Sequence, residues 1–542
     1  MAFRKQMQWM TETKRLRCPD REALWRAAGW VWLAAAWLAG VALMWRCGRS
    51  LLDSDMASEM VLADLLNREG GALSGGWYYS TELRVFCQQL LFKLGLLVFP
   101  GSWHAARILA QGLLSALLAG SYLFFARGAG LWKSAPWAAG ALVCPFGFWQ
   151  LYHGVLGGFY FVHMTFVLVS LGLAVRLARP ASRPRTALTA AALALVSFAA
   201  GLNGVRLLMN LYVPLAAACC LLLVLRFVQA PLGPGWTALP QVRAFAAAVL
   251  ACVCGCGGYL VNRVMLAARY TFLDQSARSW TALSLTGILE VWGDFLALFG
   301  YPADRWQQAA TGAVPLFSLP GLLGAAGLVL AGAVVLALAW LLKQGGELPF
   351  AHRLTGAVLA ACLLVDGVAF ACMNDGEAIN GSYWLPVAPI AIAAVAAAAE
   401  GFPLRRPALR RALAGVLAAL VVCVSAGTTL RFAAAPPHGT PGLETVAGWL
   451  KEQGYTQGYA TFWHANVVTE LTDGAIEMWQ VEDLASLKMR PWLQKADHAS
   501  PPEGRVFVLA GPGEINQSLP WTGQAEVVYS DEAGYVVFEL NQ

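Results

Sequence analysis

The chain has 542 residues, of which 58% are hydrophobic and only 13% are charged. A soluble protein of this length normally carries about a quarter charged residues, so the composition excludes an ordinary soluble protein. In so apolar a chain, the net charge of +6 is no argument for nucleic-acid binding. The sequence therefore predicts an α-helical polytopic membrane protein embedded in a lipid bilayer.

Apolar runs long enough to cross a bilayer recur along the chain. The first follows the basic residues 1–26 and runs from Ala27 to Trp45 without a small-residue cleavage site behind it. That pattern indicates a retained span and not a signal peptide. We expect about eleven spans of roughly 20 residues within residues 27–431. Their centres lie near residues 36, 115, 142, 168, 193, 218, 254, 331, 364, 391 and 421.

Basic residues are concentrated in every second short loop. The positive-inside rule then places the N-terminus and these loops in the cytoplasm. Two long loops, 46–102 and 267–314, and the tail 436–542 are accordingly expected outside the cell membrane. The two largest clusters consist of Arg176, Arg179, Arg183 and Arg185, and of Arg405, Arg406, Arg410 and Arg411.

The outer segments carry patterns of their own. In the first outer loop, Met56 to Asn67 predicts a short helix. Glu82 to Phe99 has apolar residues at helical spacing with polar residues between them, which is typical of a helix lying in the membrane interface. Ile288 to Phe299 in the second long loop is similarly amphipathic.

The tail reads as a small extracytoplasmic α/β domain, 436–542. Its helical pattern, Leu443 to Gln453, alternates with strand-like runs. These runs are Gly458 to Trp463, Arg505 to Leu509, Ala525 to Tyr529 and Tyr535 to Leu540.

An acidic cluster directly follows the first span. Asp53, Asp55 and Glu59 lie within seven residues of one another. A carboxylate can accept a proton from a substrate hydroxyl, and the pair Asp53 and Asp55 could hold a divalent cation such as Mg²⁺ or Mn²⁺ through oxygen. Aspartate and serine at this position would equally cap a helix, and the two roles are compatible.

In its layout and in two short patches, the chain resembles the GT-C class of membrane glycosyltransferases, which includes protein O-mannosyltransferases and aminoarabinose transferases. Asp53-Ser54-Asp55 matches the Asp-x-Asp form of that class's first-loop motif, and Asp55-Met56-Ala57 matches its Asp-x-Ala core. Tyr383 to Pro389 is similar to a late Arg-Tyr-x-x-Pro-x-x-Pro segment, although Ser382 replaces the arginine.

The resemblance implies an inverting glycosyltransferase in the cytoplasmic membrane of a bacterium. Such an enzyme moves a sugar from a polyprenyl-phosphate-linked donor to an extracytoplasmic acceptor, which is a cell-wall polymer, a lipid or a protein. Asp55 is the first candidate for the catalytic base and Asp53 the second, with Glu59 assisting.

The leaving phosphate of such a reaction needs cations. The candidates on the outer side are Arg206, Arg263, Arg269 and Arg84, each of which could instead reach toward lipid headgroups. The candidates for contact with the sugar are Tyr78, Tyr79, His153 and Tyr383. Tyrosines at this depth also form the aromatic belt of membrane proteins, and a single histidine there can simply pack.

One carboxylate favours a different function. Asp366 lies well inside the ninth predicted span, and an intramembrane acid is typical of a transport pathway. The alternative is therefore a transporter or flippase of lipid-linked saccharide that performs no covalent chemistry.

Overall fold

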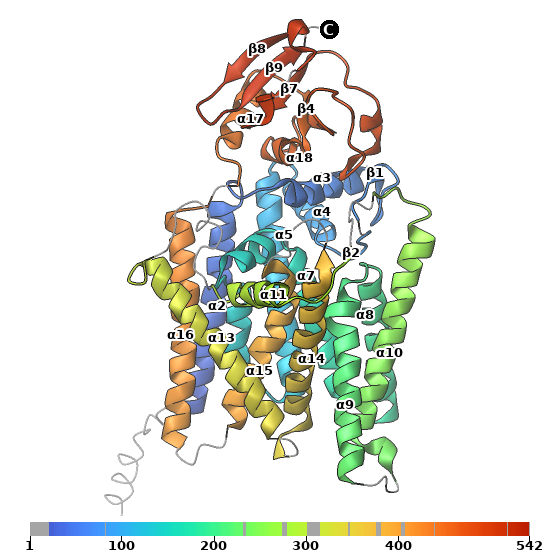
Figure 1. The fold of residues 1–542 in the computed structure, drawn as a ribbon, viewed down its shortest axis with the longest axis vertical. Helices are drawn as coiled ribbons and strands as arrows, with labels where there is room; N and C mark the ends of the chain where they lie inside the picture. Colours follow the sequence, from blue (N-terminus) through green and yellow to red (C-terminus); the bar gives the residue numbers. More distant parts are fainter. Residues whose placement is uncertain are drawn as a thin grey trace, which may run out of the picture.

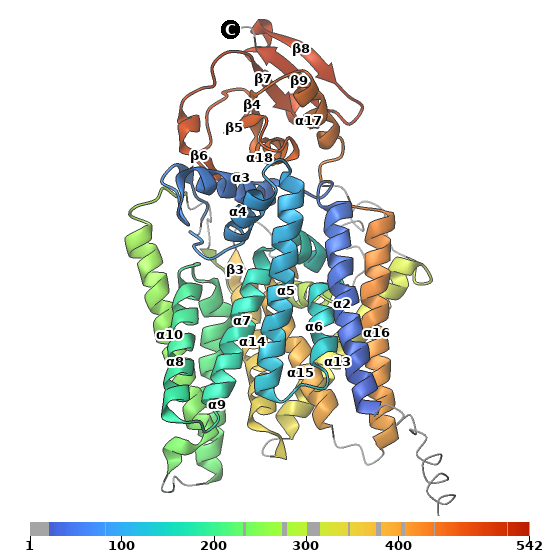
Figure 2. The ribbon, with the colours of Figure 1, turned by 180° about the vertical axis from the view of Figure 1, so that it is seen from behind.

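The computed structural model describes residues 21–81, 83–230, 233, 235–273, 279–300, 315–344, 347–374, 381–402, 407–437, 439–516 and 519–540. Figures 1 and 2 show a bundle of long helices with a sheet-containing C-terminal region at one end. The basic residues 1–20 and the parts 274–278 and 301–314 of the second predicted outer loop lie outside the described residues.

Ten helices in the described part of the chain are long and apolar enough to cross a membrane. Each coincides with one of the predicted spans, so the polytopic helical architecture is confirmed. They are α2 (Arg21–Cys47), α5 (Trp103–Ala129), α7 (Phe159–Leu177), α8 (Arg183–Gly201), α9 (Val213–Gln229) with a preceding π-helical turn (Leu208–Tyr212), α10 (Pro240–Leu260) with a following one (Val261–Leu266), α13 (Leu319–Lys343), α14 (Phe350–Cys372), α15 (Ala388–Gly401) behind a 3-10 helix (Gly381–Val387), and α16 (Pro407–Ala434).

The span predicted near residue 142 is not one continuous helix. It consists of α6 (Ala135–Val143) and a π-helical turn (Gln150–Leu156). Pro145 has no N–H and disfavours helical geometry in the residue before it, and Cys144 is accordingly extended. The buried Gln150 satisfies backbone groups at the break, because its Oε1 accepts from the Phe146 N–H and its Nε2 donates to the Leu142 carbonyl.

Two helices of the first predicted outer loop lie between the bundle and the C-terminal region (Figure 1). The predicted Met56–Asn67 helix is α3 (Ser54–Glu69), and α4 (Gln89–Val98) follows it. The predicted helix from Glu82 was too long at its start, since it begins only at Gln89. Side chains from elsewhere hold the backbone before α4, because Asn203 bonds both the N–H and the carbonyl of Phe86.

The second outer segment contains the predicted amphipathic helix as α11 (Leu285–Ala297). It follows strand β2 (Ser279–Trp280), which pairs antiparallel with β3 (Met373–Asn374) at the end of α14. The ring of Trp384 packs between α11 and the bundle and donates its indole N–H to the Val291 carbonyl at 3.1 Å. This second segment is therefore attached to the ends of later spans.

The C-terminal region is a mixed sheet with helices, as the alternation of patterns predicted. The strand order is β5-β4-β7-β9-β8, with β4 parallel to β5 and β7, and β9 antiparallel to β7 and β8. Its elements are α17 (Leu443–Glu452), β4 (Gln457–Thr461), α18 (Phe462–Leu471), β5 (Glu477–Val481), β6 (Gln494–Lys495), β7 (Val506–Ala510), β8 (Ala525–Ser530) and β9 (Val536–Leu540).

The C-terminal region is fastened to the bundle. Strand β1 (Trp77–Tyr78) of the first outer loop pairs antiparallel with β6. Arg107 in α5 forms a bidentate ion pair with Glu470 in α18, with nitrogen–oxygen distances of 2.6 and 2.7 Å. Both side chains are 5% exposed. These contacts hold the segment 46–102 between the bundle and the C-terminal region and so position its acidic cluster.

Candidate functional site

Asp53 is the N-cap of α3. Its Oδ1 accepts a 2.7 Å hydrogen bond from the Met56 backbone N–H, which is the reason that an aspartate begins this helix. Its Oδ2 accepts a hydrogen bond from the hydroxyl of Tyr152, in the π-helical turn of the broken span. Burial raises the pKa of Asp53, and the hydrogen bonds from Tyr152 and Met56 and the charge of Arg107 oppose that rise. The Asp53 side chain thus caps α3 and is bonded to the bundle through Tyr152.

Asp55 lies in different surroundings. Its side chain is exposed, and its backbone carbonyl accepts a 2.8 Å hydrogen bond from Ser58. The charge of Asp55 acts on Arg490 of the C-terminal region, where it opposes the lowering of the Arg490 pKa by burial. The guanidinium of Arg490 also lies over the Trp492 ring, 4.7 Å from its centroid. Asp53 and Asp55, the second and first candidates for the base, therefore interact with different parts of the chain.

Glu59, one turn further along α3, pairs with Arg84 at 3.6 Å. Both line a small cavity of about 20 Å³ with Trp77, Tyr79 and, from the C-terminal region, Leu493. Burial raises the pKa of Glu59, and the charges of Arg84 and Arg107 oppose this. Glu59 therefore links the acidic helix α3 to a cation that the sequence assigned to phosphate binding.

Arg206 and Arg84 meet at one aromatic ring. The guanidinium carbon of Arg84 lies 3.9 Å from the Phe159 centroid, and that of Arg206 lies 5.2 Å from it. Arg206 also donates to the Tyr160 hydroxyl at 2.6 Å and lies 5.1 Å from the Tyr383 ring. Two of the four predicted phosphate-binding arginines are therefore brought together.

A short backbone turn delivers Arg206 to this place. α8 ends at Gly201, and Gly204 has a φ of 102°, a conformation that favours glycine over residues with a Cβ. The turn places Arg206 directly before the π-helical turn that opens the next span. Gly204 thus has a conformational reason to be glycine.

A chain of side chains connects Asp53 with Arg206. Tyr152, bonded to Asp53, has its ring 4.7 Å from that of His153, and His153 lies 5.8 Å from Tyr160. Tyr160 in turn accepts from Arg206. Asp53, His153, Arg206, Tyr383 and, through Phe159, Arg84 therefore belong to one continuous cluster.

Other predicted residues lie elsewhere. Tyr79 is buried and its hydroxyl accepts from the Ser74 N–H at 2.8 Å, while Tyr78 pairs through its backbone with β6. Arg263 and Arg269 are exposed beyond α10, with the guanidinium of Arg263 5.7 Å from the Phe272 ring. Within the described part of the chain these four make no contact with Asp53 or Arg206, although Tyr79 lines the small cavity beside Glu59 and Arg84.

The pair Asp53 and Asp55, predicted to hold a cation, stays a prediction. Each oxygen of Asp53 accepts one hydrogen bond, and the charge of Asp55 acts on Arg490. In the described part of the chain, a separate group of Glu477, Asp497 and His498 has ligand atoms within 4.8 Å of one another. There the Lys495 ammonium lies 2.5 Å from Glu477, so a cation is already supplied by the protein.

Four residues around this site were not among the predicted site residues: Tyr152, Phe159, Tyr160 and Arg107. Phe159 and Tyr160 stand at the start of α7 among many aromatic residues, and nothing in their spacing distinguishes them. Arg107 had a signal, because it is a charged residue inside an apolar span. Its partner Glu470 is 363 positions away, so the pairing itself was invisible.

Comparisons with known proteins agree with this architecture. No family model matches the sequence, and neither does a curated protein. The solved structure of ArnT from Cupriavidus metallidurans bound to undecaprenyl phosphate is similar over 95% of this chain and 98% of that one, with a TM-score of 0.55 at 13% identity.

Two further solved structures are similar at lower TM-scores. An Archaeoglobus fulgidus oligosaccharyltransferase tethered with an acceptor peptide matches 96% of this chain and 74% of its own, with a TM-score of 0.48 at 13% identity. The arabinofuranosyltransferase AftD from Mycobacteria matches 94% of this chain and 40% of its own, with a TM-score of 0.44 at 15% identity. The likeness to ArnT along nearly the whole length shows that the chain has the fold of the GT-C membrane glycosyltransferases.

Proposed function

We propose that this protein is an inverting membrane glycosyltransferase. It moves a sugar from a polyprenyl-phosphate-linked donor to an extracytoplasmic acceptor hydroxyl. Asp53 acts as the base, and Arg206 and Arg84 bind the donor phosphate. The fold similarity to ArnT bound to undecaprenyl phosphate supports the class of donor.

One observation carries the proposal. Arg84 and Arg206 both lie against the Phe159 ring. Arg206 connects through Tyr160, His153 and Tyr152 to the Asp53 carboxylate. Cations at the leaving phosphate and a carboxylate at the attacking hydroxyl are the two requirements of this reaction. We choose Asp53 over Asp55, the first candidate from the sequence, because Asp53 belongs to this cluster.

The reaction is a single displacement. The acceptor oxygen forms a bond to the anomeric carbon while its proton passes to the Asp53 carboxylate. The bond between the anomeric carbon and the phosphate oxygen breaks, and its electron pair stays on the phosphate. Arg206 and Arg84 balance the negative charge that grows there. One displacement inverts the configuration at the anomeric carbon.

The test uses purified protein in lipid nanodiscs with a panel of undecaprenyl-phosphate-linked monosaccharides and the envelope fraction of the source cells as acceptor. Release of undecaprenyl phosphate measures turnover. We expect Asp53→Asn to lower kcat by about 100-fold or more, because a general base contributes 10²–10⁴. Asp55→Asn is the matched control, and loss of turnover in that variant alone would transfer the role of base to Asp55.

A variant and a control variant test the binding of the donor phosphate. Arg206→Gln should lower kcat/KM by roughly tenfold or more, because a hydrogen bond to a charged group contributes about 1.5–3 kcal/mol. Arg263→Gln changes an exposed arginine beyond α10 and should have little effect. Equal losses in the two variants would contradict the assignment of the phosphate to Arg206.

The transporter alternative depends on Asp366. That side chain is 1% exposed, lies beside Asn210 and does not line the small cavity of Glu59 and Arg84. A transporter would lose function in Asp366→Asn and would release no free undecaprenyl phosphate from any donor. An enzyme should release it and should depend on Asp53.

A further inference from the structure

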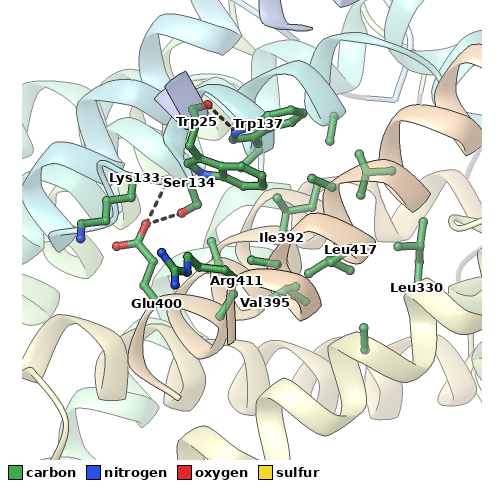
Figure 3. A pocket seen from close by; sticks show the side chains of 18 of the residues that line it. Trp25, Lys133, Ser134, Trp137, Leu330, Ile392, Val395, Glu400, Arg411 and Leu417 are labelled. Atoms are coloured by element: carbon green, nitrogen blue, oxygen red, sulfur yellow. Dashed lines mark hydrogen bonds between the residues drawn. The ribbon is translucent and has the colours of Figure 1, made fainter. Parts of the chain in front are cut away.

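A second cavity, of about 870 Å³, lies among α2, α6, α13, α15 and α16 (Figure 3). Its volume falls in the upper part of the range of ligand pockets, about 300–1,000 Å³. The segments that reach its charged residues are the start of α2, the loop before α6, the last turn of α15 and the start of α16. They lie at the end of the bundle opposite the C-terminal region (Figure 2). The cavity is therefore separate from the candidate catalytic site.

The cavity is deep and mostly apolar. Arg411 and Ser425, both on α16, line it, and their separation along a helix corresponds to about 21 Å. One leaflet of the hydrocarbon core is about 15 Å thick, so the cavity is long enough for acyl chains. An apolar wall without neighbouring atoms loses dispersion contacts, which lipid chains would restore. The apolar wall includes Trp137, Leu330, Ile392, Val395, Leu417 and Val421.

Its charged residues leave a positive excess. Four basic side chains line the cavity, Arg21, Arg26, Lys133 and Arg411, against the two acids Glu22 and Glu400. Lys133 pairs with Glu22 at 2.8 Å.

Glu400 is also engaged, since one of its oxygens accepts hydrogen bonds from the backbone N–H and the hydroxyl of Ser134 (Figure 3). Within the described ranges, no carboxylate forms an ion pair with Arg21, Arg26 or Arg411. The charged end of the cavity thus suits an anion.

We propose that this cavity binds one anionic phospholipid from the surrounding bilayer. Its acyl chains lie along the apolar wall, and its phosphate contacts Arg21, Arg26 and Arg411, since guanidinium groups bind phosphate through charge-assisted hydrogen bonds. The N-terminal residues 1–20 are a poorer occupant, because they contain five basic and only two acidic side chains and would meet like charge. Trp25 and Trp137, with ring centroids 4.7 Å apart, flank the charged end as interfacial aromatic residues do.

The test measures the melting temperature of the full chain, purified in detergent, on titration with phosphatidylglycerol, phosphatidylcholine or inorganic phosphate alone. We expect a saturable rise with phosphatidylglycerol only. The double variant Arg26→Gln and Arg411→Gln should require roughly tenfold more phosphatidylglycerol for the same rise. Arg183→Gln with Arg185→Gln, two exposed arginines outside the cavity lining, should behave as the wild type.

Native mass spectrometry supplies the stoichiometry, which should be one retained phosphatidylglycerol per chain. Ala414→Trp, which fills the cavity from α16, should abolish that retention while leaving the fold intact by circular dichroism. Equal responses to the two phospholipids, or an unchanged response in the double arginine variant, would overturn the proposal. A marked gain of lipid binding on removal of residues 1–20 would identify that segment as the occupant and overturn it too.

Discussion

The guanidinium of Arg107 in α5 lies 2.6 Å from the Glu470 carboxylate in α18, so a buried ion pair joins a membrane span to the C-terminal region. Arg107 also donates to the Met56 carbonyl of α3 at 2.9 Å. One side chain thus contacts the span, the acidic helix and the C-terminal region together. The C-terminal region is in this way part of the support for Asp53.

Breaking the ion pair of Arg107 and Glu470 should lower the stability of the fold. Arg107→Ala leaves the Glu470 charge buried without its partner, which is expected to reduce stability by about 3–5 kcal/mol. Replacing both residues by methionine should recover much of that loss, because no charge then remains buried. Thermal unfolding in detergent measures the effect.

The exposed pair of Arg49 and Glu444 is the matched control. Its side chains are 35% and 53% exposed, so Arg49→Ala should cost no more than about 1 kcal/mol through that ion pair. Melting temperatures lowered equally by Arg107→Ala and Arg49→Ala would show that the buried Arg107–Glu470 pair contributes no more to stability than the exposed pair.

The pH dependence of catalysis should report on Tyr152. Its hydroxyl lowers the pKa of Asp53, which burial raises, so Tyr152→Phe should raise that pKa further. A base with a higher pKa needs a higher pH to be deprotonated. The acid limb of kcat/KM should therefore move to higher pH by about one to two units.

Tyr160→Phe is the control for that shift, since it removes a hydroxyl that accepts from Arg206 and does not touch Asp53. It should change the KM for the donor and leave the acid limb in place. An acid limb that does not move in Tyr152→Phe would exclude Asp53 as the base.

The long apolar elements could be predicted from sequence, whereas the places where they are interrupted depended on tertiary contacts. Hydropathy suffices for a span, because a bilayer requires about 20 apolar residues regardless of neighbours. The apolar run around residue 142 satisfied that test and still broke at Pro145, where Gln150 bonds the buried backbone groups that the break leaves unpaired. Proline was visible in the sequence, but the partner that makes the break tolerable was not.

The candidate site was predicted by residue type better than by geometry. The acidic cluster after the first span and Arg206 were both candidates from the sequence, but the resemblance ranked Asp55 before Asp53, and the proposal made here reverses that order. That reversal depends on Tyr152 and Arg490, which lie about 100 and 435 positions away. Strand β5 was missed because Glu477–Val481 is short and half polar, and its pairing with β4 stabilises it.

The C-terminal region should lose stability in a defined acidic window. A hydrogen bond from His498, with a further contribution from Lys495, lowers the pKa of Glu477 from 4.5 to about 2. A carboxyl with a depressed folded-state pKa stabilises the fold above its unfolded pKa and loses that effect as the pH falls through the folded value. Stability should therefore fall between about pH 4.5 and about pH 2.

Glu477→Gln tests this window, because glutamine does not titrate. The variant should be less stable at pH 7, and its stability should change less between pH 4.5 and pH 2 than that of the wild type. Hydrogen exchange of the β5 amides measures both. An identical acid slope in the two proteins would assign the acid sensitivity to other carboxylates.

Asn203 should act as a positioning residue for the two arginines. It is 2% exposed, and its amide bonds the N–H and the carbonyl of Phe86, each at 2.7 Å. Phe86 is two residues from Arg84, and Asn203 is three residues from Arg206. The two hydrogen bonds between Asn203 and Phe86 therefore hold the backbone segments of the two arginines together. Asn203→Leu leaves the Phe86 backbone unsatisfied and should raise the donor KM by roughly tenfold, since a misplaced cation binds phosphate less well.

A general loss of stability has to be separated from this effect. Asn466 in α18 is 3% exposed and likewise holds a backbone group, donating to the Leu493 carbonyl at 2.8 Å. Asn466→Leu should lower the melting temperature to a similar extent without a selective rise in donor KM. A donor KM that rises equally in both variants would mean that Asn203 supports the fold and not the spacing of Arg84 and Arg206.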